Sequence, residues 1–366
     1  MMGPLSNWQR LLALVGGMAS AGTALLTVPA AATHPLLLIF GIAGALSLLR
    51  FAVPLSFWVD GALTLLGGVA LIASLDQIAP SLWLTLLATW LIAWLFIDRM
   101  ANSLAAGETR LPGANLIVPL VFGATLLVVW EVTVRGLSIS QVLLPAPSQI
   151  YSRIVTSPVT LWADFVQTFV KAVLSGFALG CGAGFIVAIL VDRSPFLKRG
   201  LLPIGNFVSA LPIIGIAPIM VMWFGFDWQS KTAVIVCITF FPMLVNTVAG
   251  LNAAGRMERD MMRTYAAGYW QTLVKLRLPA AAPFIFNALK INSTLALIGA
   301  IVAEFFGTPI VGMGFRIATE VGRLNADMVW AEVAVAAVAG SASYGLIALL
   351  ERAVTFWHPS VRGGRA

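Results

Sequence analysis

The sequence predicts an all-α integral membrane protein, and three observations lead to that prediction. Hydrophobic residues make up 60% of the 366 residues and charged residues only 10%, and the mean hydropathy is +0.95. A soluble chain of this length has no interior large enough for so much apolar surface. Apolar stretches long enough to cross a bilayer recur along the chain, and basic residues concentrate in alternate loops.

A membrane-spanning helix needs about 20 mostly apolar residues. Ten stretches are expected to span: Leu11–Val28, Pro35–Val53, Phe57–Leu75, Ser81–Ile97, Leu116–Val134, Leu161–Val191, Leu201–Trp223, Lys231–Leu251, Ala281–Phe306 and Asp327–Thr355. The first could instead be a signal peptide, since Ala30-Ala31-Ala32 resembles a cleavage site. An uncleaved span is favoured, because only Arg10 marks its amino-terminal flank and three apolar stretches follow at once. A surface helix is expected to begin at Pro147-Ser148.

Loop charge predicts the orientation. If the N-terminus is cytoplasmic, the inside segments hold these basic residues: Arg10, Arg50, Arg99, Arg110, Arg193, Lys198, Arg199, Arg256, Arg259, Arg263, Lys275, Arg277, Arg352, Arg362 and Arg365. The outside segments hold only Arg135, Arg153, Lys231, Arg316 and Arg323. This bias follows the positive-inside rule. An even number of spans also returns the C-terminus to the cytoplasm.

Several function classes are excluded by what the sequence lacks. The net charge of +7 does not indicate nucleic-acid binding, because no basic run with interleaved aromatic residues occurs. Cys181 and Cys237 have no metal-ligand spacing, and His34 and His358 stand apart. These residues cannot form a catalytic or metal-binding set. No GxxxxGK[ST] motif is present, so any ATP hydrolysis takes place on another polypeptide.

The chain is expected to divide at a polar segment, ANSLAAGETRLPG, that covers Ala101–Gly113. Residues 1–100 then form a four-helix membrane extension with tight turns and little charge. Residues 101–115 form a cytoplasmic linker, and residues 116–366 form a second domain with longer spans and a cytoplasmic loop at residues 256–280.

The stretch Met257–Pro283 is the longest polar interruption among the spans, and the charge rule places it in the cytoplasm. Four apolar residues recur at intervals of four and would form one helix stripe: Met257, Met261, Tyr265 and Tyr269. The dipeptide Leu278-Pro279 is expected to end the helix. The stripe predicts docking into a groove of a soluble partner, and the alternative is a basic loop that only fixes the topology.

Helix breaks and buried polar residues suggest a substrate path. Leu202–Pro218 contains Pro203, Pro212 and Pro218, which indicates either a broken helix that lines a cavity or a kinked packing helix. Glu304 lies in an apolar span, where an ionisable group is a functional hypothesis by default. The favoured alternative places it in water at the outer end of its helix.

Other polar and small residues in the spans have more ordinary interpretations. Lys171 and Lys290 can extend towards an interface. Four asparagines are candidates for substrate contact, although hydrogen bonding between helices is their commoner use: Asn206, Asn246, Asn287 and Asn292. Four glycines predict close helix packing, potentially between two copies of the chain: Gly176, Gly180, Gly182 and Gly184.

From about Trp130 to His358 the sequence resembles the permease subunit of ATP-binding-cassette (ABC) importers of the nitrate/sulfonate/taurine type. The segments that carry the resemblance are WEVTVR, LLPAPSQI, TFVKAVLSGFALGCGAGF, LPIIGIAPIMVMWFGF, FFPMLVNTVAGL, WQTLVKLRLPAAAPFI and LALIGAIVAEFFGTPIVGMGF. The resemblance implies a type I importer core of about six helices, preceded here by about four extra transmembrane helices. It also implies a multi-pass protein of the bacterial inner membrane.

The signature of that family is a cytoplasmic EAA-x3-G-x9-I-x-LP loop, which docks into the ATPase subunit. Aligned on Leu278-Pro279, it places Asp260 at the glutamate position and Ala266 at the glycine position. Gly268 could serve the turn instead. The docking residues implied by this resemblance are Asp260, Met261, Met262, Tyr265, Ala266, Gly268, Leu278 and Pro279. Asp260 is expected to cap or orient the docking helix.

The resemblance further implies a gate near Leu202–Pro218. The candidates for the gate or path are Asn206, Leu211, Pro212, Pro218, Asn246 and Glu304. The expected partners are ABC ATPase subunits that bind ATP and Mg, an extracytoplasmic solute-binding protein, a second permease copy or paralogue, and membrane lipid. No cofactor and no nucleic acid is expected on this chain.

The sequence thus predicts a transport subunit, not an enzyme. Sulfonate- or nitrate-like anions and pyrimidine- or flavin-like heterocycles both remain open as solutes. The alternative is a secondary transporter or channel that works without ATP. It would need coupling-ion groups at mid-membrane, and only Glu304 and Lys171 suggest them.

Overall fold

The computed structural model describes residues 5–27, 35–53, 55–75, 80–107, 113–209, 212–307 and 310–357. Every regular element in these ranges is helical, which confirms the predicted all-α class. By length and composition, seven helical segments in the described ranges can cross a membrane. The chain divides into two compact units, Met1–Ile150 and Tyr151–Ala366. Each unit is described by itself below.

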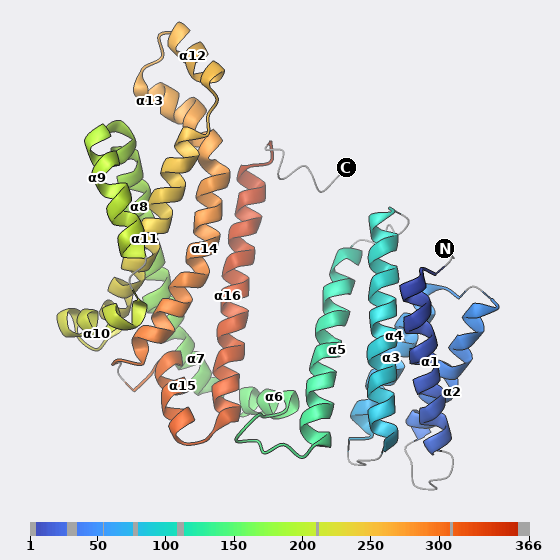
Figure 1. The fold of residues 1–366 in the computed structure, drawn as a ribbon. Coiled ribbons are helices and arrows are strands. Elements are labelled where there is room, and N and C mark those ends of the chain that lie inside the picture. The colour runs from blue at the N-terminus through green and yellow to red at the C-terminus, as the bar shows by residue number, and fades with distance from the viewer. Residues whose placement is uncertain are drawn as a thin grey trace. The chain divides into compact units, whose positions relative to one another are not determined.

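The first unit is a bundle of antiparallel helices (Figure 1). Its elements are α1 (Asn7–Thr27), α2 (Pro35–Leu46), the 3₁₀ helix η1 (Ser47–Phe51), α3 (Phe57–Ala73), α4 (Pro80–Ala105) and α5 (Ala114–Gly136). Leu37, Phe40 and Ile92 are fully or almost fully buried in its core. The contact boundary at Ile150 places α5 with the first four helices. The linker expected at residues 101–115 stays a prediction.

A buried ion triad stands inside this first unit. The carboxylate of Asp60 lies 2.7 Å from Arg50 Nη1 and 2.6 Å from Arg99 Nη1. Arg50 Nε also donates to the carbonyl of Ser47 at 2.8 Å, and Arg99 Nη2 donates to the carbonyl of Leu55 at 2.8 Å. The carboxylate forms ion pairs with both guanidinium groups, and each guanidinium also donates to a carbonyl. These contacts offset the cost of burying two arginines in an apolar bundle.

The second unit begins within α6 (Pro147–Thr156), which starts at the predicted proline. Its following elements are α7 (Pro158–Phe165), the π-helix η2 (Val166–Val173), α8 (Leu174–Arg193), α9 (Pro195–Ser209), α10 (Ile213–Phe224) and α11 (Trp228–Asn252). The remaining elements are α12 (Arg256–Thr264), α13 (Tyr269–Thr272), the π-helix η3 (Leu273–Arg277), α14 (Leu278–Glu304), α15 (Met313–Gly322) and α16 (Ala326–Val354).

Helix α11 packs between α8 and α14 and forms the centre of the second unit. Small residues allow the close approach: a Cβ atom at Gly184 would lie 2.5 Å from the carbonyl oxygen of Phe240. Gly176 and Gly180 face α11 in the same way, whereas Gly182 has open space beside it. The three glycines therefore pack helices within one chain, and the suggestion that they join two copies is wrong for them.

Asparagine supplies the polar contact of this three-helix packing. Asn292 of α14 donates from Nδ2 to the carbonyl of Thr239 in α11 at 2.8 Å and lies 3.2 Å from Cys181 Sγ in α8. Its side chain is completely buried. This confirms hydrogen bonding between helices as the use of Asn292.

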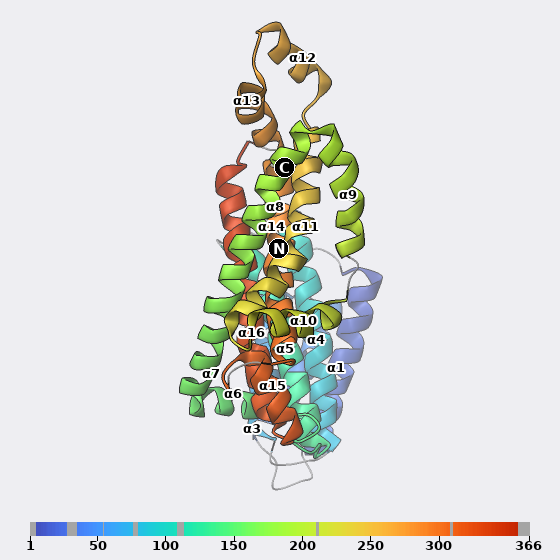
Figure 2. The same cartoon turned by 90° about the vertical axis from the view of Figure 1, so that its left-hand side faces the viewer.

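Three expected spans differ from the structure. The residues of the expected span Leu201–Trp223 fall into two helices, α9 and α10, which point in different directions (Figures 1 and 2). Pro212 caps the start of α10, and its missing N–H and fixed φ favour a new helix start there. The expected spans at Pro35–Val53 and Phe57–Leu75 are shorter apolar helices, Pro35–Phe51 and Phe57–Ala73.

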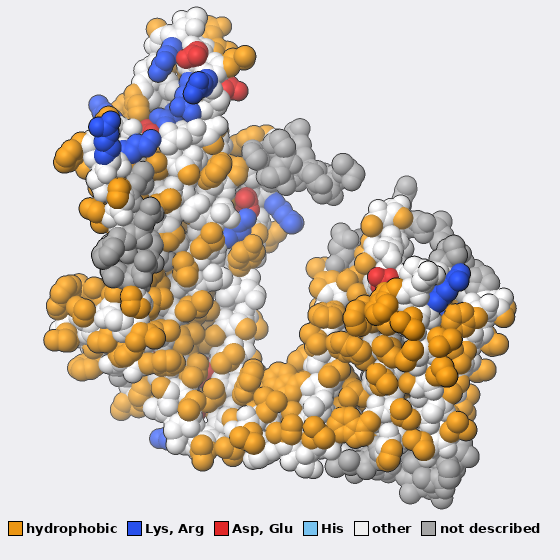
Figure 3. Space-filling model, in the orientation of Figure 1, with side chains coloured by type: hydrophobic (Ala, Val, Ile, Leu, Met, Phe, Trp, Pro, Cys, Tyr) orange, Lys and Arg blue, Asp and Glu red, His pale blue; other side chains and the backbone are white. Residues whose placement is uncertain are grey.

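The surface of each unit fits a bilayer. Apolar side chains cover the middle of each unit (Figure 3), and large exposed examples occur on helices of both: Leu25, Leu65, Leu120, Ile186, Leu190 and Leu346. In a membrane such residues face lipid, while the helices satisfy their own backbone polar groups. Many of the basic residues visible on the second unit lie at the end that carries α12 (Figure 3).

Candidate coupling surface and substrate path

Helix α12 projects from one end of the second unit, beyond the ends of α8, α11 and α14 (Figures 1 and 2). None of its residues is buried. The side chain of Met257 is 84% exposed, that of Met261 is 55% exposed, and that of Tyr265 is 79% exposed. Large apolar groups in this number on one short, otherwise charged helix indicate a contact surface.

The acidic residue of the predicted docking motif lies in the middle of α12. Asp260 is exposed, and its nearest cation is Arg263 at 3.6 Å. The N-cap of α12 is Gly255, so the expectation that Asp260 caps this helix is wrong. Because Asp260 has only a long, exposed ion pair, its carboxylate is free to meet a partner's cation.

A left-handed residue ends α12. Ala266 has φ +53°, its N–H donates to the carbonyl of Arg263, and the N–H of Ala267 donates to that of Met262. This is a Schellman arrangement, in which glycine is usual because a Cβ strains the left-handed conformation. Ala266 occupies the glycine position of the motif. Gly268 has φ −69°, so the suggestion that it serves the turn is wrong.

The turn removes Tyr269 from the predicted stripe. Tyr269 begins α13, where its hydroxyl donates to Asp192 Oδ2 at 3.0 Å and its ring lies beneath Arg193. The expected four-residue stripe is therefore wrong at its last member. The four-residue spacing of apolar residues continues through Tyr269 in the sequence, but α12 ends at Thr264.

The helix also continues through Leu278-Pro279, contrary to expectation. Helices α13, η3 and α14 form one 36-residue segment, Tyr269–Glu304. Pro279 falls in the first turn of α14, where a missing N–H is tolerated. The wider turns of η3 precede it, with the N–H of Leu278 donating to the carbonyl of Leu273. Both Leu278 and Pro279 are half-buried beneath α12 and α13.

The candidate gate residues are only partly described. Pro212 and Pro218 lie at the start and in the middle of α10. Leu211 lies outside the described residues, and so does the side chain of Asn206 in α9. Asn246 donates from Nδ2 to the carbonyl of Pro242 in its own helix at 2.8 Å. The described residues of this region form two helices, α9 and α10, but the expectation that they line a path or gate stays a prediction.

Glu304 takes part in a buried cap at the opposite end of the unit. Three successive N–H groups at the start of α15 donate to side chains of other helices: Gly312 to Asp164, Met313 to Thr168 and Gly314 to Glu304, at 2.6 to 2.8 Å. Thr168 Oγ1 donates to the second oxygen of Glu304 at 2.7 Å. Glu304 is 2% exposed, so the favoured expectation of a solvated position is wrong.

Charged groups around this cap are also engaged. Arg316 Nε donates to Asp164 at 2.8 Å, and this bond raises the pKa of Arg316. Lys231 Nζ donates to the carbonyls of Phe226 and Gly307. Asp227 lies just before α11 and accepts hydrogen bonds from the side-chain amide of Gln167 and from the N–H of Trp228. These two bonds lower the pKa of the Asp227 carboxyl.

Of the other predicted polar residues, Lys290 has a definite partner. Its Nζ lies 2.7 Å from Glu351 Oε2, which joins α14 to α16. Lys171 donates to Gln167 Oε1 at 2.9 Å. Asn287 is exposed.

Comparison with known proteins identifies the family. The profile of the family described as "Binding-protein-dependent transport system inner membrane component" matches residues 180–356. The chain is 30% identical over 239 residues to the formylaminopyrimidine transport permease protein ThiX of Halalkalibacterium halodurans, covering 65% of this chain and 95% of that protein. The chain belongs to this family.

Two further relatives have similar coverage. The permease is 30% identical over 251 residues to the riboflavin transport system permease protein RibX of Chloroflexus aurantiacus, covering 68% of this chain and 92% of that protein. It is 29% identical over 248 residues to the putative aliphatic sulfonates transport permease protein SsuC of Bacillus subtilis, covering 67% and 88%. These findings confirm the predicted resemblance. About a third of the permease has no counterpart in these proteins.

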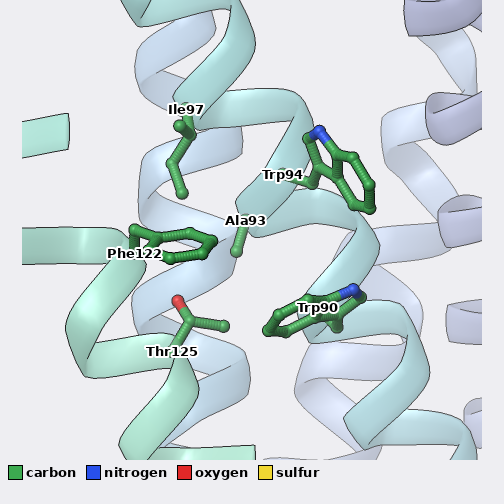
Figure 4. A pocket seen from close by; sticks show the side chains of 6 residues that line it. All are labelled: Trp90, Ala93, Trp94, Ile97, Phe122 and Thr125. Carbon is green, nitrogen blue, oxygen red and sulfur yellow. The ribbon is translucent and has the colours of Figure 1, made fainter. Parts of the chain in front are cut away.

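The first unit of the permease lies outside the family match and holds an apolar pocket of about 320 Å³ between α4 and α5 (Figure 4). Phe122 and Thr125 of α5 face Trp90 and Ala93 of α4, and the ring centroids of Trp90 and Phe122 are 6.5 Å apart. The Thr125 hydroxyl donates to its own helix at 2.7 Å. This lining suits an apolar group.

Sequence reasoning missed the contacts that hold α12 in place. Arg259 donates to the carbonyls of Asn252 and Ala254, and Arg277 pairs with Asp192. From the sequence, both arginines serve only as positive charges that mark the cytoplasmic side of the membrane. A signal was available, because Asp192 is an isolated acid at the end of an apolar stretch whose neighbouring loop is strongly basic.

Proposed function

We propose that the permease is the transmembrane subunit of an ATP-driven importer, and that ATPase subunits dock on α12. The observation that carries the proposal is the exposed stripe of Met257, Met261 and Tyr265 on a helix that projects from the basic end of the second unit. Apolar side chains without a partner on one face of a helix fit a groove on another protein. The family match to binding-protein-dependent systems supports the same partner class.

The basic end of the second unit is taken as cytoplasmic. Eight basic residues lie on α8, α9, α12 and the segment to η3: Arg193, Lys198, Arg199, Arg256, Arg259, Arg263, Lys275 and Arg277. The positive-inside rule supports this orientation. It turns the α15 end towards the extracytoplasmic side, where a solute-binding protein delivers its ligand. Both chain termini are then expected in the cytoplasm.

In this proposal the ATPase subunits bind ATP and Mg, and the permease converts their movement. ATP favours one arrangement of the ATPases, which carries α12 with it, and hydrolysis releases that arrangement. A second permease, either another copy or a paralogue, completes the pathway. The region of α9 and α10 is the proposed gate, because the prolines in its sequence favour irregular backbone, which a membrane tolerates where it lines a cavity.

A small heterocycle is the first candidate solute, with a sulfonate- or nitrate-like anion second. Two of the relatives at 30% identity are named for a pyrimidine and for riboflavin. Two lysines in the spans already have partners, because Lys290 pairs with Glu351 and Lys231 donates to a carbonyl oxygen. They are therefore less suited to bind an anionic solute, which supports placing the heterocycle first. The name of the sulfonate relative supports the anion.

Co-purification tests the proposal. The tagged permease is isolated from its native host, and its partners are identified by mass spectrometry. Tyr265→Arg places a charge on the apolar stripe and should lower ATPase recovery about tenfold, as expected for a contact hot spot. The matched control is Tyr151→Arg, an exposed tyrosine of α6. An unmodified permease without an ATPase would favour the ATP-independent transporter.

A further inference from the structure

The two ends of the α12 loop are fixed to the spans by arginines. Where the chain leaves α11, Arg259 donates from Nε to the carbonyl of Ala254 at 2.9 Å and from Nη2 to that of Asn252 at 2.7 Å. Asn252 is the last residue of α11, and Ala254 follows just beyond its C-cap, where helices leave acceptors unpaired. A cation near a helix C-terminus is also favoured by the helix dipole. The start of α12 is thereby tied to α11.

Where the chain returns to the membrane, Arg277 joins three elements. Its Nη1 and Nη2 atoms donate to the two carboxylate oxygens of Asp192 at 2.7 Å each, and its Nε donates to the carbonyl of Leu251 at 2.9 Å. Asp192 lies in the last turn of α8, Leu251 lies in the last turn of α11, and Arg277 ends η3. A two-pronged pair of this kind fixes direction as well as distance.

The Asp192 carboxylate also holds α13. The hydroxyl of Tyr269 donates to Asp192 Oδ2 at 3.0 Å, and the Arg193 guanidinium lies 5.7 Å from the centre of the Tyr269 ring. The side chain of Asp192 is only 4% exposed and that of Arg277 12%. Both are therefore shielded from the solvent screening that weakens surface ion pairs.

Apolar packing lies directly against this group of contacts. Leu251, Leu273 and Ala281 form a buried cluster, against which Tyr269 and Ile189 pack. The side chains of α12 have no such support, since none of them is buried. Movement of α12 can therefore reach the spans through Arg259 at one end and through the Asp192 contacts at the other.

We propose that Asp192 is a positioning residue that transmits displacement of the α12 loop to α8 and α11. The proposal rests on the docking role of α12 proposed above and adds the route from the docking surface into the spans. In the permease, one carboxylate receives both guanidinium prongs of Arg277 and the hydroxyl of Tyr269. Its removal should leave the exposed stripe intact while separating loop movement from the spans.

The test measures hydrogen–deuterium exchange of the ATPase-bound permease in lipid nanodiscs, with and without ATP and vanadate. In the unmodified complex, ATP should change exchange both in α12–α13 and at the carboxyl ends of α8 and α11. In Asp192→Asn, ATPase recovery and the α12–α13 response should persist. The response of α8 should be lost, and that of α11, which Arg259 still contacts, should be reduced. This readout needs no knowledge of the transported solute.

Further variants separate transmission from general damage. Arg277→Lys keeps the charge but not the two-pronged geometry and should behave like Asp192→Asn. The double variant Asp192→Asn/Arg277→Gln should be no worse than either single change, because both act through one pair. If Asp192→Asn does not fold, Tyr269→Phe decides: it removes one hydrogen bond and should weaken only the α8 and α11 response.

The matched control is Asp327→Asn. Asp327 receives Arg153 at 2.8 Å at the other end of the unit, so the chemical change is the same. This control should leave the ATP response of α8 and α11 unchanged. An unaltered response of these helices in the Asp192 and Arg277 variants would overturn the proposal, as would loss of ATPase recovery in them. An unmodified permease that binds no ATPase would instead contradict the proposed function.

Discussion

At the scale of single residues, Ala266 is the position where the sequence and the backbone disagree. Its φ of +53° belongs to the left-handed region, in which a Cβ costs about 1–2 kcal/mol. The turn itself is well made, because two backbone hydrogen bonds close it. The strain therefore comes from the side chain alone, which explains why the docking motif has glycine at this position.

Ala266→Gly should stabilise the α12 loop. Relief of the left-handed strain exceeds the added entropy of an unfolded glycine, for a net gain of up to about 1 kcal/mol. Protection of α12 amides against hydrogen exchange in the unbound permease measures the effect. Gly268→Ala is the comparison: its φ is −69° and no atom lies within 4 Å of an added Cβ, so it should not weaken protection. Lower protection in Ala266→Gly would contradict the strain argument.

At the scale of elements, the packing of α8 on α11 depends on which face each glycine occupies. Gly184 meets the backbone of α11, with the Phe240 carbonyl oxygen 2.5 Å and the Met243 Cβ 2.9 Å from an added Cβ. Gly182 has no neighbour within 4 Å of an added Cβ. The four glycines of this helix look alike in the sequence, and only the packing distinguishes them.

Gly184→Ala and Gly182→Ala should have opposite effects on stability. Within a helix, replacing glycine by alanine normally stabilises by about 1 kcal/mol, as expected for Gly182. At Gly184 the added methyl group must push α11 away, which should destabilise by about 1–3 kcal/mol. Thermal unfolding of the purified permease in detergent measures both. Equal effects of the two substitutions would show that α8 does not lie against α11 through Gly184.

At the scale of the whole molecule, the region matched by the family profile and the first compact unit occupy different parts of the chain. The alignments cover 88–95% of three relatives but only 65–68% of this permease. The matched family region, residues 180–356, lies entirely in the second compact unit. The first unit has its own buried core around Phe40 and its own ion triad at Asp60.

A chain beginning at Gly107 should still assemble with the ATPase subunits. The docking helix and the Asp192 contacts lie within the second unit and need no residue of the first four helices. Recovery of the ATPase with the shortened permease, compared with the full-length chain at equal membrane expression, measures this. Failure to assemble would assign the first four helices a role beyond scaffolding.

The sequence by itself determined the class of the protein and the location of the exposed apolar stripe on α12. The composition requires a membrane environment, because a water-soluble fold of this length could not remove so much apolar surface from water. The four-residue spacing of Met257, Met261 and Tyr265 placed the exposed stripe correctly, since a helix face follows from local periodicity. The sequence also indicated a helix break within Leu202–Pro218, but not that Pro212 would precede the new helix while Pro203 and Pro218 lie inside helices.

Only the tertiary structure decided which partners the polar residues have. Glu304 caps α15 together with Asp164 and Thr168, which lie more than 130 positions away in the sequence. Asp192 meets Arg277 across 85 positions. A local pattern can mark such a residue but does not name its partner. A buried charge needs a counter-charge or hydrogen-bond donors, and the packing of the helices decides which groups supply them.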